Sequence, residues 1–574
     1  MIVCGRWCAL TLSAVAVIVV GCSSSPSPEG GEGAVTLAVV NGKIWTGDPS
    51  RPWAEALAVR DDRLVVIGSS DEVRRVAGGA RVIDAGGRLL TPGFNDAHVH
   101  FLQGGFDLAS VQLRDARTPE VFAARLREFA TTVPAGTWIT GGNWDHELWG
   151  GALPRADWID AGTPTHPVLV SRLDGHMALA NRAAMTAAGI TRATKDIEGG
   201  TIVRDANGEP TGVFKDNAMS LFDGVVPDPT PEMSDRALQA ATDYALAQGV
   251  TTVQHMGSWS DLETFRRARA TSALRLRMYA AVPIASWERL RDTVARKEHG
   301  ADGRGDHWLA IGALKGFVDG SLGSHTAAFH EPFGDAPHDR GLFVNTPENL
   351  YAWISGADKA GLHVVVHAIG DRANGMLLDI YDRVIRENGP RDRRFRIEHA
   401  QHLAPPDIAR FPALGVIASM QPYHAIDDGR WAGKVIGPER IKTTYAFRAL
   451  LDAGATLAFG SDWPVAPATP LEGVYAAVTR RTIDGANPDG WVPAQRIAVE
   501  EALRAYTTGP ALAEYAEADK GRLVPGMLAD FVVIDQDLFS IPPERIREAR
   551  VTMTVVGGRL AYADVGGHEA SVRR

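Results

Sequence analysis

The sequence predicts an α/β protein: a (β/α)8 TIM-type barrel with an inserted subdomain, plus a small β-sandwich domain formed by both termini. Short apolar strands alternate with amphipathic helices through the middle of the chain, as in a parallel sheet covered by helices. Near both ends, β-branched residues alternate with turn residues instead. The 574 residues, 45% of them hydrophobic, are enough to bury the cores that this fold needs.

The charge balance argues against a nucleic-acid partner. The chain has 59 Lys and Arg against 69 Asp and Glu, which gives a net charge of −10. A nucleic-acid surface would require basic patches. With 22% charged residues, the composition also differs from that of disordered chains and fibrous repeats. We therefore expect a folded protein whose partner is a small-molecule substrate.

The first residues resemble a bacterial lipoprotein signal. Arg6 precedes an apolar run over 9–20, which is too short for a comfortable transmembrane helix and matches a secretory signal. The run ends in Val19-Val20-Gly21-Cys22, which resembles the lipobox, where the cysteine is diacylated. We predict a signal peptide over 1–21, lipidation at Cys22 and a flexible tether over 22–34. The alternative is an ordinary signal peptide that is cut elsewhere.

The expected location is the cell envelope, with the lipid anchor as the membrane contact. Ser23 follows the lipidated cysteine, where an aspartate commonly retains lipoproteins in the inner membrane of Gram-negative cells. In such a cell, the sequence therefore favours the periplasmic side of the outer membrane. In a Gram-positive cell, the anchor would place the protein on the outer face of the cytoplasmic membrane. The oligomeric state stays open, with a homodimer as one option.

All three cysteines, Cys4, Cys8 and Cys22, lie in the export segment. The folded part therefore has no internal disulfide, no thiol nucleophile and no Cys-ligated zinc site. Its stability must come from core packing and from any metal that it binds.

Turn signals at both ends of the chain define the β-domain. The segments 35–47, 54–68 and 80–93 carry β-branched residues, and Asn41-Gly42 and Gly86-Gly87 are hairpin signals. Similar patterns recur after residue 520. We predict a composite β-domain over 35–92 and 516–565, followed by a C-terminal tail over 566–574.

The barrel is predicted over 93–515. Its candidate strands span 92–100, 250–256, 274–282, 308–320, 363–371, 394–402, 416–424 and 456–464. Eight β/α units suggest a TIM-type barrel, whose active site lies at the C-terminal ends of the strands. The gap after the first strand is too long for one crossover, so we place an inserted subdomain over 101–235.

One unit shows how the helices are specified. Thr346 can cap the free backbone amides, Pro347 suits the first helical position, and Gly361 ends the helix. Between them, apolar residues recur at helical spacing, which predicts one buried face. A buried strand follows at once.

Polar residues near the strand ends are the candidate metal-site residues: His98, His100, Lys315, His367, His399 and Asp462. His98 and His100 are two positions apart on a strand, so both imidazoles point to one face. Such a pair alone is weak evidence for a metal site. Here, however, four histidines from three predicted strands and one aspartate are expected at the same end of the barrel. Imidazole and carboxylate suit zinc, and an open ligand position is typical of a catalytic site.

Five segments resemble the amidohydrolase superfamily, specifically the family 3 group of YtcJ-type metal-dependent hydrolases. They read TPGFNDAHVH, GALKGFVDGSLGS, VVVHAIGDRA, RIEHAQ and LAFGSDWPV. Upstream, WITGGNWDHELW, PVLVSRLDGHMALAN and GEPTGVFKDNAM resemble the same group. The resemblance covers 35–563.

The resemblance implies a metal centre of His98, His100, His367, His399 and Asp462, with Lys315 as a carbamylated bridge between two ions. A plain ammonium would be repelled by divalent ions, whereas addition of carbon dioxide makes an anionic oxygen ligand. With Lys315 unmodified, a single ion held by the histidines and Asp462 is the alternative. The expected cofactor is therefore zinc, as one or two ions.

The expected reaction is hydrolysis of a C–N bond in an amide, a cyclic amide or an N-substituted formamide by a metal-activated hydroxide. Asp462 is the expected general base, passing the water proton to the leaving amine. Alternatives are a deaminase or an ester or carbamate hydrolase on the same site. A non-catalytic surface binding lipoprotein is a further alternative, against which the complete set of six residues argues.

Substrate-facing candidates come from the inserted subdomain and from the ends of strands: Trp144, Asp145, Asp174, His176, Asp319, Ser321 and Gln421. Trp144 is expected to wall an apolar pocket, and Gln421 to hydrogen-bond the scissile group. Family members commonly carry arginine where this chain has His325, so no anion contact is carried over to that position.

Overall fold

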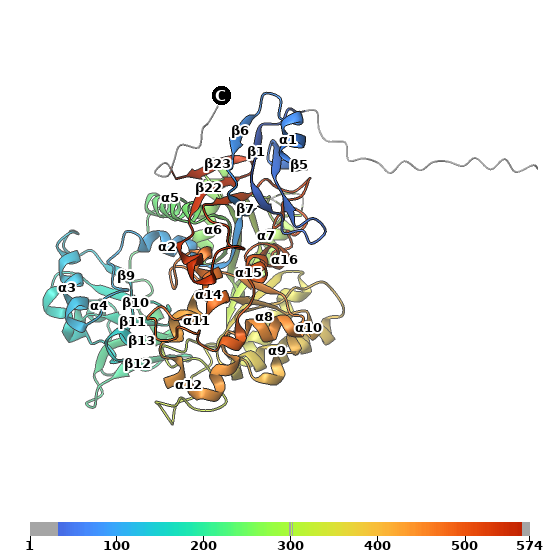
Figure 1. The fold of residues 1–574 in the computed structure, drawn as a ribbon. Helices are drawn as coiled ribbons and strands as arrows, with labels where there is room; N and C mark the ends of the chain where they lie inside the picture. The colour runs from blue at the N-terminus through green and yellow to red at the C-terminus, as the bar shows by residue number, and fades with distance from the viewer. Residues whose placement is uncertain (1–32, 298–299, 301, 565–574) are drawn as a thin grey trace, which may run out of the picture. The chain divides into compact units, whose positions relative to one another are not determined.

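The computed structural model describes residues 33–297, 300 and 302–564, and Figure 1 shows their fold. The predicted signal peptide over 1–21, Cys22, nearly all of the tether and the tail over 566–574 lie outside the described residues. The described residues from 34 onward form one compact unit. Within the described part of the chain, no helix combines the length and the apolar character needed to cross a membrane.

Eight parallel strands form the central sheet. In sheet order they are β8 (Phe94–Val99), β14 (Val250–Met256), β15 (Arg277–Pro283), β16 (Leu309–Phe317), β17 (His363–Ala368), β18 (Arg396–His399), β19 (Ile417–Met420) and β20 (Leu457–Phe459). Each overlaps one predicted strand. Beyond β20, Asp462 N donates to His98 O at 2.7 Å and His100 N donates to Trp463 O at 2.8 Å. These bonds tie the last strand to the first, and the predicted TIM-type barrel is confirmed.

The helix α8 (Pro347–Lys359) illustrates the outer layer of the barrel. The Thr346 hydroxyl accepts a hydrogen bond from Asn349 N, as its capping position predicts. Leu350, Ile354 and Ala357 are fully buried, and Gly361 takes a positive φ of 74° after the helix. α8 lies beside α9 (Asp371–Asn388) on the outside of the barrel (Figure 1).

The segment between β8 and β14 contains a five-stranded sheet of its own, and we call this segment the inserted subdomain. The sheet has the order β12 (Gly200–Arg204), β13 (Pro210–Asp216), β11 (Met177–Ala180), β10 (Val168–Arg172), β9 (Ile139–Trp144). Helix α3 (Pro119–Ala130) contributes Phe122 and Leu126 to its buried core. Helix α5 (Pro231–Ala247) then returns the chain to the barrel.

Both termini build the β-domain, which has two sheets. One has the order β5 (Arg63–Gly68), β4 (Ala56–Arg60), β1 (Leu37–Val40), β6 (Arg81–Asp84). The other has the order β23 (Arg559–Ala563), β22 (Val551–Val556), β21 (Phe531–Ile534), β7 (Leu89–Pro92), β2 (Lys43–Trp45), β3 (Trp53–Ala54). Side chains of both sheets, including Val39 and Phe531, share one buried cluster.

Two predicted hairpins are wrong. β1 and β2 flank Asn41-Gly42 but belong to different sheets, and so do β6 and β7 around Gly86-Gly87. Asn41, Gly86 and Gly87 do have positive φ angles. Turn residues of this kind set a change of direction, but the partner of the next strand is chosen by packing. Here they carry the chain from one sheet to the other.

Candidate metal centre

The six predicted metal-site residues lie at one end of the barrel. His98 and His100 come from the end of β8, Lys315 from β16 and His367 from β17. His399 is the last residue of β18, and Asp462 follows β20. All are buried except His100, whose side chain is 28% exposed.

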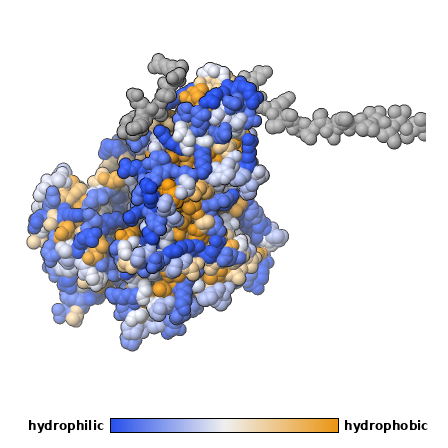
Figure 2. Space-filling view, in the orientation of Figure 1, coloured by the Kyte–Doolittle hydropathy of each residue, from blue (hydrophilic) through white to orange (hydrophobic). Residues whose placement is uncertain are grey.

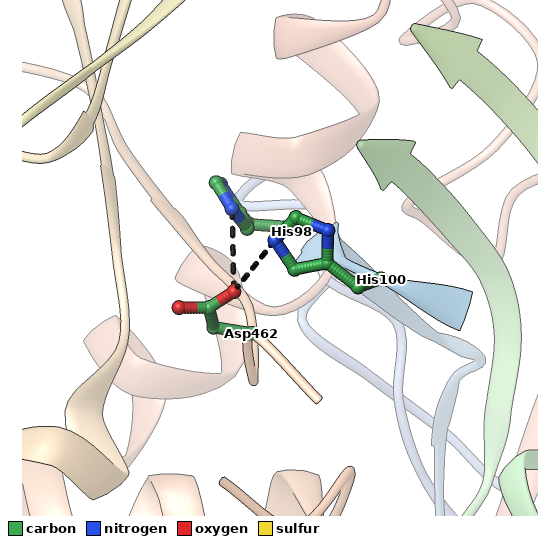
Figure 3. Close-up of side chains that lie close together, drawn as sticks. All are labelled: His98, His100 and Asp462. Atoms are coloured by element: carbon green, nitrogen blue, oxygen red, sulfur yellow. Dashed lines mark ion pairs between the residues drawn. The ribbon is translucent and has the colours of Figure 1, made fainter. Parts of the chain in front are cut away.

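Asp462 joins the histidines of two different strands. Its Oδ1 lies 3.4 Å from His98 Nε2 and 3.3 Å from His100 Nε2 (Figure 3). Its Oδ2 lies 4.0 Å from His399 Nδ1. The rings of His399 and His367 have centroids 4.4 Å apart. The structure therefore brings together residues that are up to 364 positions apart in the sequence.

The donor set fits a divalent cation. Ligand atoms of His98, His100 and Asp462 all lie within 4.8 Å of one another. Asp462 Oδ1 is buried and has no hydrogen-bond partner, although an unpaired buried oxygen is costly. Burial lowers the pKa of His98 to about 4 and the pKa values of His367 and His399 well below 6.5. These imidazoles are therefore neutral and have lone pairs for a metal.

Lys315 lies against this group. Its Nζ is 3.3 Å from His98 Nε2 and 4.8 Å from the centroid of the Phe317 ring. Burial lowers the pKa of the Lys315 amine to about 8, which increases the fraction in the neutral, nucleophilic form near neutral pH.

Glu398 orients His98 and was not predicted from the sequence. His98 Nδ1 donates to Glu398 Oε2 at 2.5 Å, which leaves Nε2 to face Asp462. Arg396 donates to both oxygens of Glu398 at 2.7 and 2.9 Å, and Ser419 donates to Oε2 at 2.7 Å. Burial alone would raise the pKa of Glu398, but the Arg396 guanidinium and His98 hold it well below its usual range. The available signal was its position beside His399 on the strand.

Gln421 has a different place from the predicted one. It is fully buried behind His399, whose Nδ1 donates to its Oε1 at 2.8 Å. This bond leaves His399 Nε2 as the free nitrogen. Gln421 is not among the residues that line the cavity beside the metal centre. It positions a histidine, so the prediction of a contact with the scissile group is corrected.

His424 is a second residue that sequence reasoning missed. It lies in the first turns of α11 (Pro422–Asp428), directly after β19. Its ligand nitrogen lies within 4.8 Å of ligand atoms of His399 and Asp462. His424 Nε2 is buried without a hydrogen-bond partner. The available signal was its place just beyond a barrel strand, where active-site residues of this fold occur.

The cavity beside the metal centre has walls from the barrel and from the inserted subdomain. The subdomain supplies Asp145, Arg172, Leu173, Asp174 and His176. The barrel supplies residues that include His367, His399, Asp462 and Ser321. Four of the predicted substrate-facing residues, Asp145, Asp174, His176 and Ser321, therefore line this cavity.

Besides Gln421, two predicted substrate-facing residues do not line it. Trp144 is fully buried in the subdomain core, where its Nε1 donates to Val170 O at 2.8 Å. Asp319 is buried and accepts backbone hydrogen bonds from Ala328, Ile369 and Gly370. The prediction that Trp144 and Asp319 contact the substrate is therefore corrected. The Trp144 ring packs in the core of the subdomain, and the Asp319 carboxylate pairs with buried backbone amides that would otherwise lack a partner.

Hydrogen bonds attach the subdomain to the barrel at the cavity. Asp174 accepts hydrogen bonds from Ser321 and Ser324 of the loop after β16, and pairs with Arg172 Nη1 at 2.6 Å. His176 Nδ1 donates to Asp216 Oδ1 at 2.6 Å. His325 pairs instead with Asp335 at 3.0 Å and is not a wall residue.

Known proteins resemble this chain over most of its length. The sequence model of the amidohydrolase family matches residues 81–562. The Arabidopsis thaliana protein LONG AFTER FAR-RED 3 is 41% identical, with 92% of this chain and 91% of that protein covered. The N-substituted formamide deformylase of Arthrobacter pascens is 30% identical, with 92% and 99% covered. A metal-dependent hydrolase from Pyrococcus horikoshii OT3 superposes with a TM-score of 0.72 at 27% identity, covering 88% and 99%.

Proposed function

Because the chain belongs to the amidohydrolase family, we propose that it is a metal-dependent hydrolase that cleaves the C–N bond of an amide, a cyclic amide or an N-substituted formamide. The family match and the solved metal-dependent hydrolase give the reaction class and the need for a divalent metal. The formamide deformylase supports the narrower substrate class. The observation that carries the proposal is the unpaired, buried Asp462 Oδ1 that faces two histidine nitrogens.

Zinc is the proposed ion, because neutral imidazoles and a carboxylate suit it. His98, His100 and Asp462 would hold one ion, and His367, His399 and a carbamylated Lys315 would hold a second. Bound there, the metal supplies Lewis-acid polarisation of the substrate carbonyl and acidifies a water molecule.

The chain's own groups supply the proton transfer and the orientation. Asp462 accepts the proton of the attacking water on a carboxylate oxygen and passes it to the leaving nitrogen. Glu398 and Gln421 fix the Nδ1 protons of His98 and His399. The lone pair of each ring is then on Nε2, and Nε2 of His98 faces Asp462. The hydrogen bond between Ser321 and Asp174 holds two walls of the cavity together.

We also propose that the enzyme is anchored in the cell envelope through Cys22. Labelled palmitate is expected in the wild-type protein and absent from Cys22→Ala. Equal labelling of both proteins would contradict a lipid anchor at this residue.

The hydrolase proposal is tested with purified protein, zinc and a set of N-substituted formamides. Asp462→Asn keeps the shape of the side chain but removes the base, so we expect kcat to fall at least about 100-fold. Formate release measures turnover, and circular dichroism checks the fold. The proposal fails if Asp462→Asn turns over formamides as fast as the wild type.

A further inference from the structure

The cavity beside the metal centre is rich in carboxylates. Its lining includes Asp145, Asp174, Asp427, Asp428 and Asp462, against two guanidinium groups, Arg172 and Arg430. With Asp462 counted as part of the metal centre, four carboxylates still stand against two guanidinium groups on the other walls of the cavity. The field in the cavity therefore opposes an anionic substrate and attracts a cationic one.

Both arginines already have carboxylate partners. Arg172 pairs with Asp174 at 2.6 Å and with Asp145 at 3.5 Å. Arg430 pairs with Asp145 at 3.2 Å and also contacts Asp427. Among the described residues of the lining, no cationic side chain is thus left to bind a substrate carboxylate.

Asp428 is different, because no described residue forms an ion pair with it. Its Oδ2 accepts hydrogen bonds from Tyr445 Oη at 2.6 Å and from Gln401 Nε2 at 3.0 Å. These bonds fix the carboxylate in the cavity wall, while Oδ1 has no hydrogen bond from the described part of the chain. Burial raises the pKa of Asp428 to about 7, so a nearby positive charge would stabilise the carboxylate.

Helix α11 carries both Asp428 and His424, which is a neighbour of the metal centre. His424 lies beside His399 and Asp462, and Asp428 follows four residues later in the same helix. Residues four apart lie on the same helix face, about 6 Å apart along the axis. Leu173, Trp431 and Val465 give the cavity apolar wall groups for a connecting chain.

We propose that the cavity selects substrates in which a short aliphatic chain joins the scissile amide or formamide to a positively charged nitrogen, and that Asp428 binds this nitrogen. The inference rests on the proposed function, which places hydrolysis at the metal centre beside the same cavity. The rise of about 6 Å between His424 and Asp428 along α11 corresponds to about four methylene groups between two nitrogens. Asp428 is then a specificity-determining residue.

The test uses three formamides of equal length on the zinc-loaded protein. N-formyl-1,4-diaminobutane is cationic, N-pentylformamide is neutral, and N-formyl-4-aminobutanoate is anionic. The matching methanesulfonamides resist hydrolysis and report binding by calorimetry. We expect the cationic sulfonamide to bind about 10-fold more tightly than the neutral one, with the anionic one weakest. The same ranking is expected for kcat/KM of the formamides.

The variant Asp428→Asn is expected to bring the cationic-to-neutral affinity ratio to about one. Asp71→Asn is the matched control, because Asp71 has a side chain that is 92% exposed and lies in the β-domain. It removes the same charge and should keep the wild-type ratio. The wild-type ranking stands as a test even if Asp428→Asn folds poorly.

Equal affinities of the three sulfonamides for the wild type would overturn the proposal, and so would an unchanged ratio in folded Asp428→Asn. A preference for the cationic sulfonamide without hydrolysis of any formamide would support the cation site and count against the proposed hydrolase activity. The two ideas therefore fail separately.

Discussion

At the scale of single residues, Glu398 decides which nitrogen of His98 faces the metal centre. We expect Glu398→Gln to lower zinc affinity by about 10-fold to 100-fold, because a neutral amide holds the Nδ1 proton less firmly. Competition with a coloured chelator measures the affinity. Ser419→Ala is the control, because it removes a single hydrogen bond to Glu398 and should have a smaller effect. Unchanged zinc affinity in Glu398→Gln would refute this role.

Asp107 gives a pH-dependent prediction away from the metal centre. It ends α2 (Phe101–Asp107), is buried, and accepts a hydrogen bond from Asn143 Nδ2 at 3.0 Å. Burial raises its pKa to about 6. The folded state therefore binds the proton more tightly than the unfolded state, and the contribution of Asp107 to stability falls as the pH rises from about 4 to about 6.

Asp107→Asn removes this cost while keeping the hydrogen bond. We expect Asp107→Asn to have a higher free energy of unfolding than the wild type, and this difference to be about 1 kcal/mol larger at pH 8 than at pH 5. Urea unfolding at the two pH values measures it. The same gain at both values would show that the carboxyl does not titrate as described.

The sequence predicted the metal-site residues because each stands at the end of an apolar strand. Residues that orient them were harder to find. In the sequence, Glu398 and Arg396 have the spacing of an ordinary salt bridge on one strand. Their contact with His98 becomes visible only when the barrel strands are assembled. Trp144 was misplaced because a buried tryptophan has the same sequence signature in a core as in a pocket wall.

At the scale of elements, a buried ion pair joins the barrel to the β-domain. Arg277 begins β15 and donates to both oxygens of Asp530, at 2.6 and 2.9 Å. Gly557 N also donates to Asp530 Oδ1 at 2.7 Å. Both side chains are almost fully buried. Removal of one partner would leave an uncompensated charge in the interior.

We expect Asp530→Asn to lower the free energy of unfolding by about 3–5 kcal/mol. Glu439→Gln is the control, because the pair Lys442–Glu439 is exposed and its loss should change stability by less than about 1 kcal/mol. Chemical denaturation compares the variants. Equal stability of the two variants would contradict the role of the buried pair.

The eight barrel strands were predictable because a parallel sheet covered by helices requires continuous apolar runs. The order of strands in the other sheets was not predictable, because those strands are short. The turns at Asn41-Gly42 and Gly86-Gly87 show the limit: their φ angles follow from residue type, whereas the partner strands follow from the packing of two sheets.

At the scale of the whole molecule, the contacts with the β-domain and the candidate active site lie at different ends of the barrel strands. Hydrophilic residues cover much of the face drawn in Figure 2, and hydrophobic residues gather in its central part. The β-domain contacts the barrel through Arg277, at the start of a strand, whereas the inserted subdomain reaches the opposite ends of the strands at the cavity. The barrel thus keeps its C-terminal strand ends for the site, as in other enzymes of this fold.

The metal content of the purified protein tests the central claim most directly. The proposed centre predicts at least one tightly bound zinc per chain, with a second ion accompanied by a mass excess of about 44 Da for the carbamate on Lys315. Elemental analysis and native mass spectrometry measure both quantities. A protein that holds no zinc, manganese or cobalt after addition of each ion, while staying folded, would contradict the metal-dependent mechanism.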